Sequence, residues 1–267
     1  FFKDYMSAII TSIYNCPVKS ISFQNIDKCK INKNIGIEGD RVFAFSQNLD
    51  LDQSKEFEKN PEARKGKWNK IVTLKNTPVF NKYNFLYENN KLTLTIKDKE
   101  IININVNDSN ERNNLVKKLI ELEGSLKNDI RLMRNDAHPF YDTSISNKSM
   151  FRNSISLLNI NSIKDFENKI NQKIEKSIFR GNLYFDGIEA WEERNWIGKT
   201  IKINDVLFKV EKNIPRCVAI NLKPKTDDNS FNLLKTLKET YDHYDMGVYL
   251  TPENDGEINL SEKILIK

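Results

Sequence analysis

Hydrophobic and polar residues alternate between residues 83 and 106, which indicates β-strands. Leu92, Leu94 and Ile96 fall on one face of an extended chain, because successive side chains of a strand lie on opposite faces. The same alternation returns in residues 102–106 after a short polar turn. The stretch is therefore predicted to form an antiparallel meander.

Two other segments have the spacing of helices. Residues 108–124 begin with Asp108 and Glu111 at the spacing of a capping box and end at Gly124, a common stop residue. Residues 161–176 carry apolar residues three and four positions apart, which predicts a second helix. The apolar positions of this second helix are Ile163, Phe166, Ile170 and Ile174.

The second half of the chain returns to the strand pattern. Residues 201–203 and 206–210 are short apolar runs separated by Asn204 and Asp205, which favours a tight hairpin. Residues 250–267 are predicted to form another hairpin. Many short strands with a few short helices are typical of a mainly β protein of the α+β class, built from barrels.

Two barrel-like domains are predicted, at residues 7–135 and 136–267. The polar segment 134–149 is typical of a loop and divides the chain roughly in half. The charged segment 46–70 is interpreted as an excursion on the surface.

The composition indicates a folded core without a strong net charge. With 267 residues, 39% of them hydrophobic, the chain is long enough to bury a sizeable core. Its 42 basic and 37 acidic residues give a net charge of +5, and the two signs are interspersed. This pattern favours an anionic ligand over a nucleic-acid polymer, so a nucleic-acid-binding barrel is the third and weakest hypothesis.

The cysteines exclude a disulfide framework and favour a reducing compartment. Cys16, Cys29 and Cys217 are three in number and have no CxxC spacing, so they cannot build an all-cysteine zinc or iron-sulfur site. No apolar run approaches the roughly 20 residues of a membrane-spanning helix.

Cys217 is a candidate for chemistry because it follows Pro215 and Arg216 in "KNIPRCVAINL". A single free cysteine is commonly a small buried hydrophobic residue, and that alternative stays open here. The charge of Arg216 would favour the thiolate if the two share a site, and a thiolate is a nucleophile and a soft metal ligand.

Three basic residues lie in short turn-like settings, namely Lys19, Arg41 and Arg180. Each alone is commonly a solvated or capping side chain. Together they suggest a phosphate site, because Arg offers a planar fork and Lys a point charge. Ser20 and Asn182 would supply the neutral donors that complete such a site.

Five stretches in their order along the chain resemble a protein of the MOSC superfamily with its N-terminal β-barrel domain, the group that includes the mitochondrial amidoxime-reducing component and its bacterial relatives. The stretches are "IYNCPVKSI", "GIEGDRVFAF", "FRGNLYFDGIEAWEERNWIGKTIKI", "IPRCVAINLKP" and "GVYLTPENDGEI". The resemblance implies that residues 7–135 are the N-terminal MOSC-type β-barrel domain and residues 136–267 the MOSC domain. It also implies a molybdenum cofactor, a molybdenum-pyranopterin, between the two domains.

The resemblance assigns roles to single residues as well. Cys217 would be the catalytic residue and the protein ligand to molybdenum. The residues that would hold the pterin and its phosphate are Lys19, Ser20, Arg41, Arg180, Asn182 and Arg216. The chain departs from the family with "NLKP", where Lys223 replaces an acid, and with "FRGN" in place of "FRPN". The stretch with Arg152, Asn153 and Ser154 is a further candidate contact.

The implied activity is the reduction of small N-hydroxylated substrates such as hydroxylamines, amidoximes or N-hydroxylated bases, with electrons from a separate electron-donor protein. The alternative is a sulfur carrier or a molybdenum cofactor carrier that uses Cys217. The expected location is the bacterial cytoplasm or, if a leader or anchor has been removed ahead of Phe1, an organelle. Pyridoxal phosphate binding and detoxification are further expectations attached to the resemblance.

Overall fold

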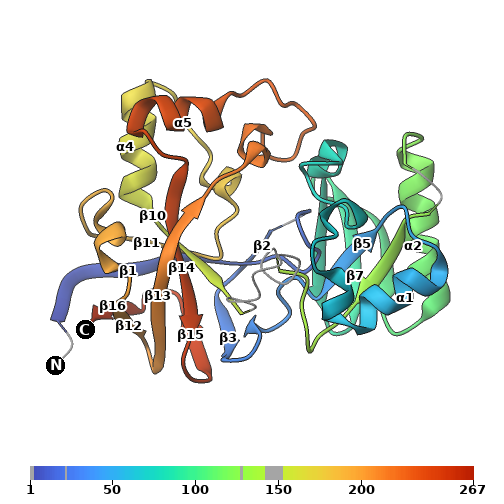
Figure 1. Cartoon of the computed structure of the whole chain (residues 1–267), viewed down its shortest axis with the longest axis horizontal. Coiled ribbons are helices and arrows are strands. Elements are labelled where there is room, and N and C mark those ends of the chain that lie inside the picture. The colour runs from blue at the N-terminus through green and yellow to red at the C-terminus, as the bar shows by residue number, and fades with distance from the viewer. Residues whose placement is uncertain (1–2, 22, 127–128, 142–152) are drawn as a thin grey trace.

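The computed structural model describes residues 3–21, 23–126, 129–141 and 153–267, and its backbone forms two adjoining bodies (Figure 1). One body is a β-barrel with two helices over it. The other body contains the α-helices of the first half of the chain and two small sheets. The mainly β, α+β class predicted from the sequence is confirmed.

Seven strands close the barrel. They follow the order β11-β10-β14-β13-β12-β16-β1, and β1 closes the ring by pairing with both β16 and β11. All neighbouring pairs are antiparallel except β10 with β11. The strands of the barrel are β1 (Lys3–Asn15), β10 (Ile155–Asn159), β11 (Leu183–Asp186), β12 (Thr200–Ile203), β13 (Val206–Pro215), β14 (Asp245–Pro252) and β16 (Lys263–Ile266).

Four short strands extend the barrel. β2 (Gln24–Ile26) pairs with the end of β1, and a separate three-stranded sheet lies beside it. That sheet consists of β15 (Gly256–Asn259), β3 (Lys28–Asn32) and β4 (Gly36–Ile37). Alternate side chains of the barrel strands fill one apolar core, which includes the buried ring of Trp196.

Two helices cover one end of the barrel, α4 (Ile160–Ile170) and α5 (Leu233–Tyr241) (Figure 1). The predicted helix over 161–176 is too long, because Asn171 adopts the left-handed conformation that ends α4. Ile174 is still buried in the same apolar cluster, but it reaches that cluster from the loop after the helix.

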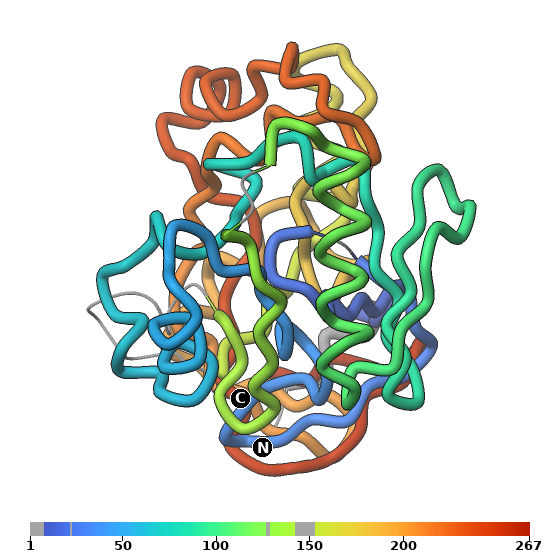
Figure 2. The backbone as a smooth tube through the Cα atoms, turned by 90° about the vertical axis from the view of Figure 1, so that its right-hand side faces the viewer, coloured from blue at the N-terminus to red at the C-terminus, as the bar shows by residue number. Residues whose placement is uncertain are grey.

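The second body has a core of its own, and Figure 2 views it from the front. The predicted meander and helix are confirmed, and Asp108 caps α2 by accepting from the backbone of Asn110 and Glu111. Glu111 accepts from the backbone N–H of Asn105, so the reciprocal half of a capping box is absent there. The elements of this body are β5 (Phe43–Ser46), α1 (Leu51–Lys59), β6 (Tyr83–Glu88), β7 (Lys91–Ile96), β8 (Lys99–Asn105), α2 (Ser109–Leu122) and β9 (Arg131–Arg134).

The charged segment 46–70 is more than a surface excursion, so this prediction is wrong in part. It contains α1, and the side chain of Arg64 is completely buried. The Arg64 guanidinium donates to the main-chain oxygens of Phe57, Glu58 and His138, which compensates its desolvation. The short 3-10 helices of the chain are η1 (Pro61–Arg64), η2 (Trp68–Lys70), η3 (Pro78–Lys82), η4 (Lys176–Phe179), η5 (Glu192–Trp196) and η6 (Val218–Asn221).

The hairpin across Asn204 and Asp205 is confirmed, since Ile203 pairs with Val206. The hairpin predicted for residues 250–267 is wrong. β14, β15 and β16 all lie in or next to this stretch, but each pairs with strands from elsewhere in the chain.

The domain division at residues 135 and 136 stays a prediction. β1 and β3 come from the first part of the chain and pair with strands of the second part. Much of the polar segment 134–149 lies outside the described residues. Within the described part of the chain, no helix has the length and apolar character needed to cross a bilayer.

Candidate functional site

A cavity of about 530 Å³ lies where the two bodies meet, and both halves of the chain line it. The first half contributes the turn after β1 and the segment around η2. The second half contributes η4 and the end of β13. The predicted site residues that line this cavity are Lys19, Ser20, Arg41, Arg180, Arg216 and Cys217.

The charged residues of the cavity wall are all basic. They are Lys19, Arg41, Lys75, Arg180 and Arg216, and no Asp or Glu is among the described residues of the lining. Five cations around one cavity attract an anion and repel a cation, and the low dielectric of a partly enclosed site strengthens both effects.

The turn after β1 is tied to the start of β5 by main-chain hydrogen bonds. The backbone N–H of Arg41 donates to Cys16 O at 2.6 Å, and that of Lys19 donates to Phe43 O at 2.8 Å. Ser20 and Arg41 both have positive φ, so each marks a sharp change of chain direction. These bonds bring Lys19 and Arg41 to the same wall although they lie 22 positions apart.

Asp40 organises this wall, and the sequence analysis did not identify it. Its carboxylate accepts from Cys16 N at 2.7 Å and from Asn182 Nδ2 at 3.2 Å, and it forms an ion pair with Arg41. The side chain is 1% exposed. Burial raises the pKa of Asp40, and the Arg41 guanidinium opposes that shift.

Asn182 does not line the cavity. Its Oδ1 accepts from Ser156 Oγ at 2.9 Å, and its Nδ2 also donates to Tyr14 O at 3.2 Å. Arg41 Nη1 lies 3.5 Å from the same Oδ1. The geometry makes Asn182 a residue that fixes Arg41 and Asp40 rather than one that faces the cavity.

Arg180 brings a buried donor without a protein acceptor to the cavity, as far as the described residues show. It adopts positive φ after η4, and its guanidinium lies 4.6 Å from the centre of the Phe23 ring. The Nη2 atom is buried, and no described residue accepts a hydrogen bond from it. Burial lowers the pKa of this guanidinium, so a bound anion would relieve an electrostatic cost.

Arg216 differs from Arg180 because main-chain oxygens take its hydrogen bonds. Nη1 donates to Phe179 O at 2.6 Å, Nε donates to Met246 O at 3.0 Å, and Nη2 also donates to Met246 O. Burial lowers the pKa of Arg216 as well. This guanidinium holds η4 and the start of β14 against the chain that carries Cys217.

The three cysteines are free thiols in different settings. Cys217 is exposed at the cavity, directly before η6. Cys16 is buried, lines the same cavity and donates from Sγ to Val18 O at 3.2 Å. Cys29 is buried in the barrel core, where desolvation raises the pKa of its thiol to about 12. Across the described residues, no group of three or more His, Cys, Asp or Glu is placed to hold a metal ion.

The departures from the family pattern have local structural roles. Lys223 forms an ion pair with Asp228 and does not line the cavity. The backbone N–H of Gly181 donates to Tyr184 Oη at 3.0 Å, a bond that proline could not make. Arg152 lies outside the described residues, and neither Asn153 nor Ser154 lines the cavity.

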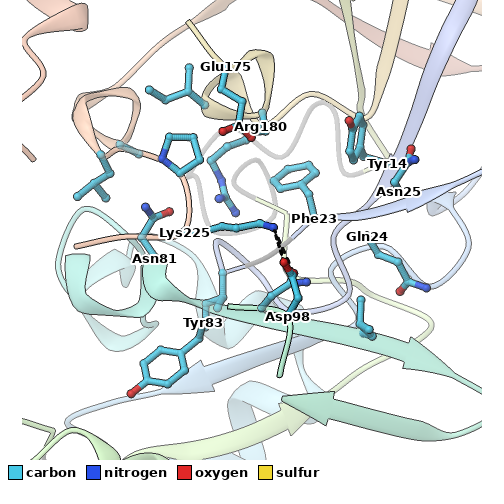
Figure 3. Close-up of a pocket in the computed structure, with 18 residues that line it drawn as sticks. Tyr14, Phe23, Gln24, Asn25, Asn81, Tyr83, Asp98, Glu175, Arg180 and Lys225 are labelled. Atoms are coloured by element: carbon cyan, nitrogen blue, oxygen red, sulfur yellow. Dashed lines mark hydrogen bonds and ion pairs between the residues drawn. The ribbon is translucent and has the colours of Figure 1, made fainter. Parts of the chain in front are cut away.

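A second cavity, also of about 530 Å³, adjoins the first at Arg180 (Figure 3). Phe23 lies beside the guanidinium, and Lys225 reaches across to Asp98 with an Nζ–Oδ2 distance of 3.2 Å. Asn81 Nδ2 donates to Lys223 O at 2.8 Å and to Thr226 O at 2.7 Å. These contacts fasten the loop 223–228 of the second half to the first half.

The sequence analysis also missed Trp68 and Lys75 in the first cavity. Both belong to a stretch without a recognisable motif, and the fold brings them to the cavity that Cys217 also lines. The sequence signal that could have drawn attention to this stretch is a tryptophan within a charged segment.

Residues 142–264 match the model of the MOSC domain family. Over 72 residues the chain is 33% identical to mitochondrial amidoxime reducing component 2 from Rattus norvegicus. That match spans 27% of this chain and 21% of the length of the curated relative.

Solved structures are similar to the chain at low identity. The YuaD protein from Bacillus subtilis has a TM-score of 0.46 and 11% identity, covering 100% of this chain and 98% of that chain. YiiM from Geobacillus stearothermophilus has a TM-score of 0.35 and 14% identity, covering 42% of this chain and 53% of that chain. The resemblance to the MOSC domain family therefore rests on the sequence match of residues 142–264, which is a little under half of the chain.

Proposed function

We propose that the protein is a molybdenum cofactor-dependent oxidoreductase that reduces small N-hydroxylated compounds. The observation that carries the proposal is the all-basic cavity with an exposed Cys217 at its edge, contributed partly by the MOSC domain. A cofactor with a phosphate at one end and a metal at the other needs cations and a soft ligand at separate ends of one cavity.

The residues present fit such a cofactor. The buried Nη2 of Arg180 has no acceptor among the described residues, and a phosphate oxygen would supply one. Lys19 is 1% exposed and lies in the same wall, where its ammonium would add a point charge. Ser20 would donate its hydroxyl. Arg41 would present a guanidinium that Asp40 already orients.

Cys217 would bind the metal through its thiolate, with Arg216 holding the chain that carries it. The bound cofactor would supply the two-electron reduction of the N–O bond. The protein would supply ligation, orientation and a positive environment. Its three cysteines are too few for a four-cysteine iron-sulfur cluster, so a separate electron-donor protein is proposed to supply the electrons.

The test compares Cys217→Ser with wild-type protein, both made in a host that synthesises the cofactor. Molybdenum and pterin content and reduction of a hydroxylamine are measured together. Cys217→Ser is expected to abolish turnover and the metal's spectroscopic signature while keeping pterin, because Lys19, Arg41 and Arg180 still hold the phosphate end.

Cys29→Ser is the matched control, because Cys29 lies in the barrel core away from the cavity. Cys16→Ser is unsuitable as a control, since Cys16 lines the same cavity as Cys217. Substantial turnover in Cys217→Ser, or an equal loss in both cysteine variants, would refute the assignment.

The exposure of Cys217 also supports the second candidate, a sulfur carrier or molybdenum cofactor carrier. Protein that carries a persulfide on Cys217, or passes the cofactor to another protein and reduces nothing, would favour that role. The comparisons lend no support to pyridoxal phosphate binding or to detoxification.

A further inference from the structure

Trp68 is a large aromatic residue that the fold leaves exposed at the edge of the Cys217 cavity. Its side chain is 41% exposed, and it lines the cavity from the opposite half of the chain to Cys217. Its ring offers a large, flat apolar surface on which another planar group can stack.

The main chain around Trp68 is held by hydrogen bonds, while its side chain stays partly exposed. Ile71 N donates to Trp68 O at 3.4 Å, and Lys70 N donates to Lys67 O at 3.0 Å. Ile71 is completely buried and forms a bridge to Ser46. A fixed backbone limits the positions that the indole can take, which suits a recognition surface.

The side of the cavity that carries Cys217 also has apolar residues. Ile214 and Pro215 precede Cys217 in the cavity lining, and Ala219 and Ile220 follow it. The charges farther along the wall are all basic, which disfavours a cationic substrate. A neutral, flat, apolar group bearing an N-hydroxyl function suits these surfaces.

We propose that Trp68 is the specificity-determining residue of the site, and that it stacks on the planar unsaturated part of a neutral N-hydroxylated substrate. The inference rests on the proposed function, because that function places the reacting nitrogen near Cys217. Offset stacking of a substrate ring on the indole would favour planar substrates over saturated ones of the same size. The chemistry at nitrogen would be the same for both.

The test uses benzamidoxime and cyclohexanecarboxamidoxime, which share the reacting group and differ in the flatness of the ring. Binding to the cofactor-loaded protein is measured by calorimetry, and turnover of both compounds by steady-state kinetics. Wild-type protein is expected to bind benzamidoxime about tenfold more tightly, as one stacking contact with its buried area would give. Trp68→Ala is expected to remove this preference, and Trp68→Phe to keep part of it.

Ile197→Ala is the matched control, since Ile197 is also 41% exposed and does not line the cavity. It should leave the preference unchanged. In Trp68→Ala the loss should appear in KM for benzamidoxime, with kcat for the saturated compound unaffected.

Each outcome separates the two proposals. If the protein reduces both compounds and Trp68→Ala keeps the wild-type preference, the stacking role is overturned and the reductase function stands. If the protein reduces neither compound but loses benzamidoxime binding in Trp68→Ala, the stacking surface is supported and the reductase function fails. Equal binding of the two compounds by wild-type protein also overturns the stacking role.

Discussion

Two arginines line the same cavity, and the structure predicts opposite consequences for their removal. The Arg216 guanidinium is bonded to the main-chain oxygens of Phe179 and Met246, whereas that of Arg180 has no acceptor for its buried Nη2 among the described residues. Methionine keeps most of the aliphatic stem and removes the charge. Arg216→Met and Arg180→Met therefore isolate the guanidinium groups.

The magnitudes follow from the hydrogen bonds. In Arg216→Met, two main-chain oxygens each lose a charged donor, at a cost of about 1 to 3 kcal/mol for each group left without a partner. Relief of the guanidinium's desolvation offsets part of this, so a loss of about 3 kcal/mol in the free energy of unfolding is expected. Arg180→Met loses the contact with Phe23 and relieves a buried unpaired donor, and the two effects leave stability within about 1 kcal/mol of wild type.

Urea unfolding of cofactor-free protein measures the two free energies, and cofactor content after dialysis measures retention. Arg216→Met should unfold at a clearly lower urea concentration. Arg180→Met should unfold near the wild-type midpoint but lose cofactor, because one charge-assisted hydrogen bond to phosphate is worth about 1.5 to 3 kcal/mol. The reasoning is wrong if Arg216→Met unfolds at the wild-type midpoint, or if Arg180→Met retains cofactor as well as wild type does.

Two further predictions concern the loop over the second cavity and the acid stability of the barrel. Asn81→Ala should speed hydrogen exchange in residues 223–228 by removing bonds of 2.8 and 2.7 Å, with exchange in the barrel strands as an unchanged control; unchanged exchange in the loop would contradict the fastening role. Burial raises the pKa of Asp165, but hydrogen bonds from Trp191 and Tyr241 outweigh it and hold the pKa below its usual value. Stability from this carboxylate is present above the unfolded pKa of about 4 and is lost as pH falls through the lower folded pKa, so Asp165→Asn should flatten the acid limb of a stability-against-pH curve. An unchanged acid limb would show that other groups control it.

The sequence predicted those strands and helices whose signals lie within a few neighbouring residues. β7, β8 and α2 were found because side-chain alternation and capping act within a few residues. The end of α4 was misplaced because Asn171 turns the chain out of the helix before the apolar repeat ends. Strand pairing was harder, since the strands of residues 250–267 pair only with distant segments.

Site residues that lie in recognisable sequence motifs could be predicted. Site residues whose role depends on contacts between distant parts of the chain could not. Arg180 and Cys217 stand in recognisable stretches, and both line the cavity. Asp40 could not be found, because its role depends on Asn182 approaching from 142 positions away. The sequence analysis grouped Arg216 with the cofactor-binding residues, because only the folded main chain shows that its guanidinium donates to the carbonyl groups of Phe179 and Met246.

The closure of the barrel by β1 has a consequence for how the protein is made. β1 is synthesised early, whereas its partner β16 lies at residues 263–266. The barrel can therefore close only after Ile266, which pairs with Lys3, has been synthesised. Such distant pairing gives a high contact order and slow folding. Until it closes, the incomplete barrel has unpaired strand edges, which can pair with other chains and cause aggregation. We therefore expect chaperones to protect the growing polypeptide. A circularly permuted chain that joins β16 directly to β1 would turn the slowest contact into a local one and should fold faster.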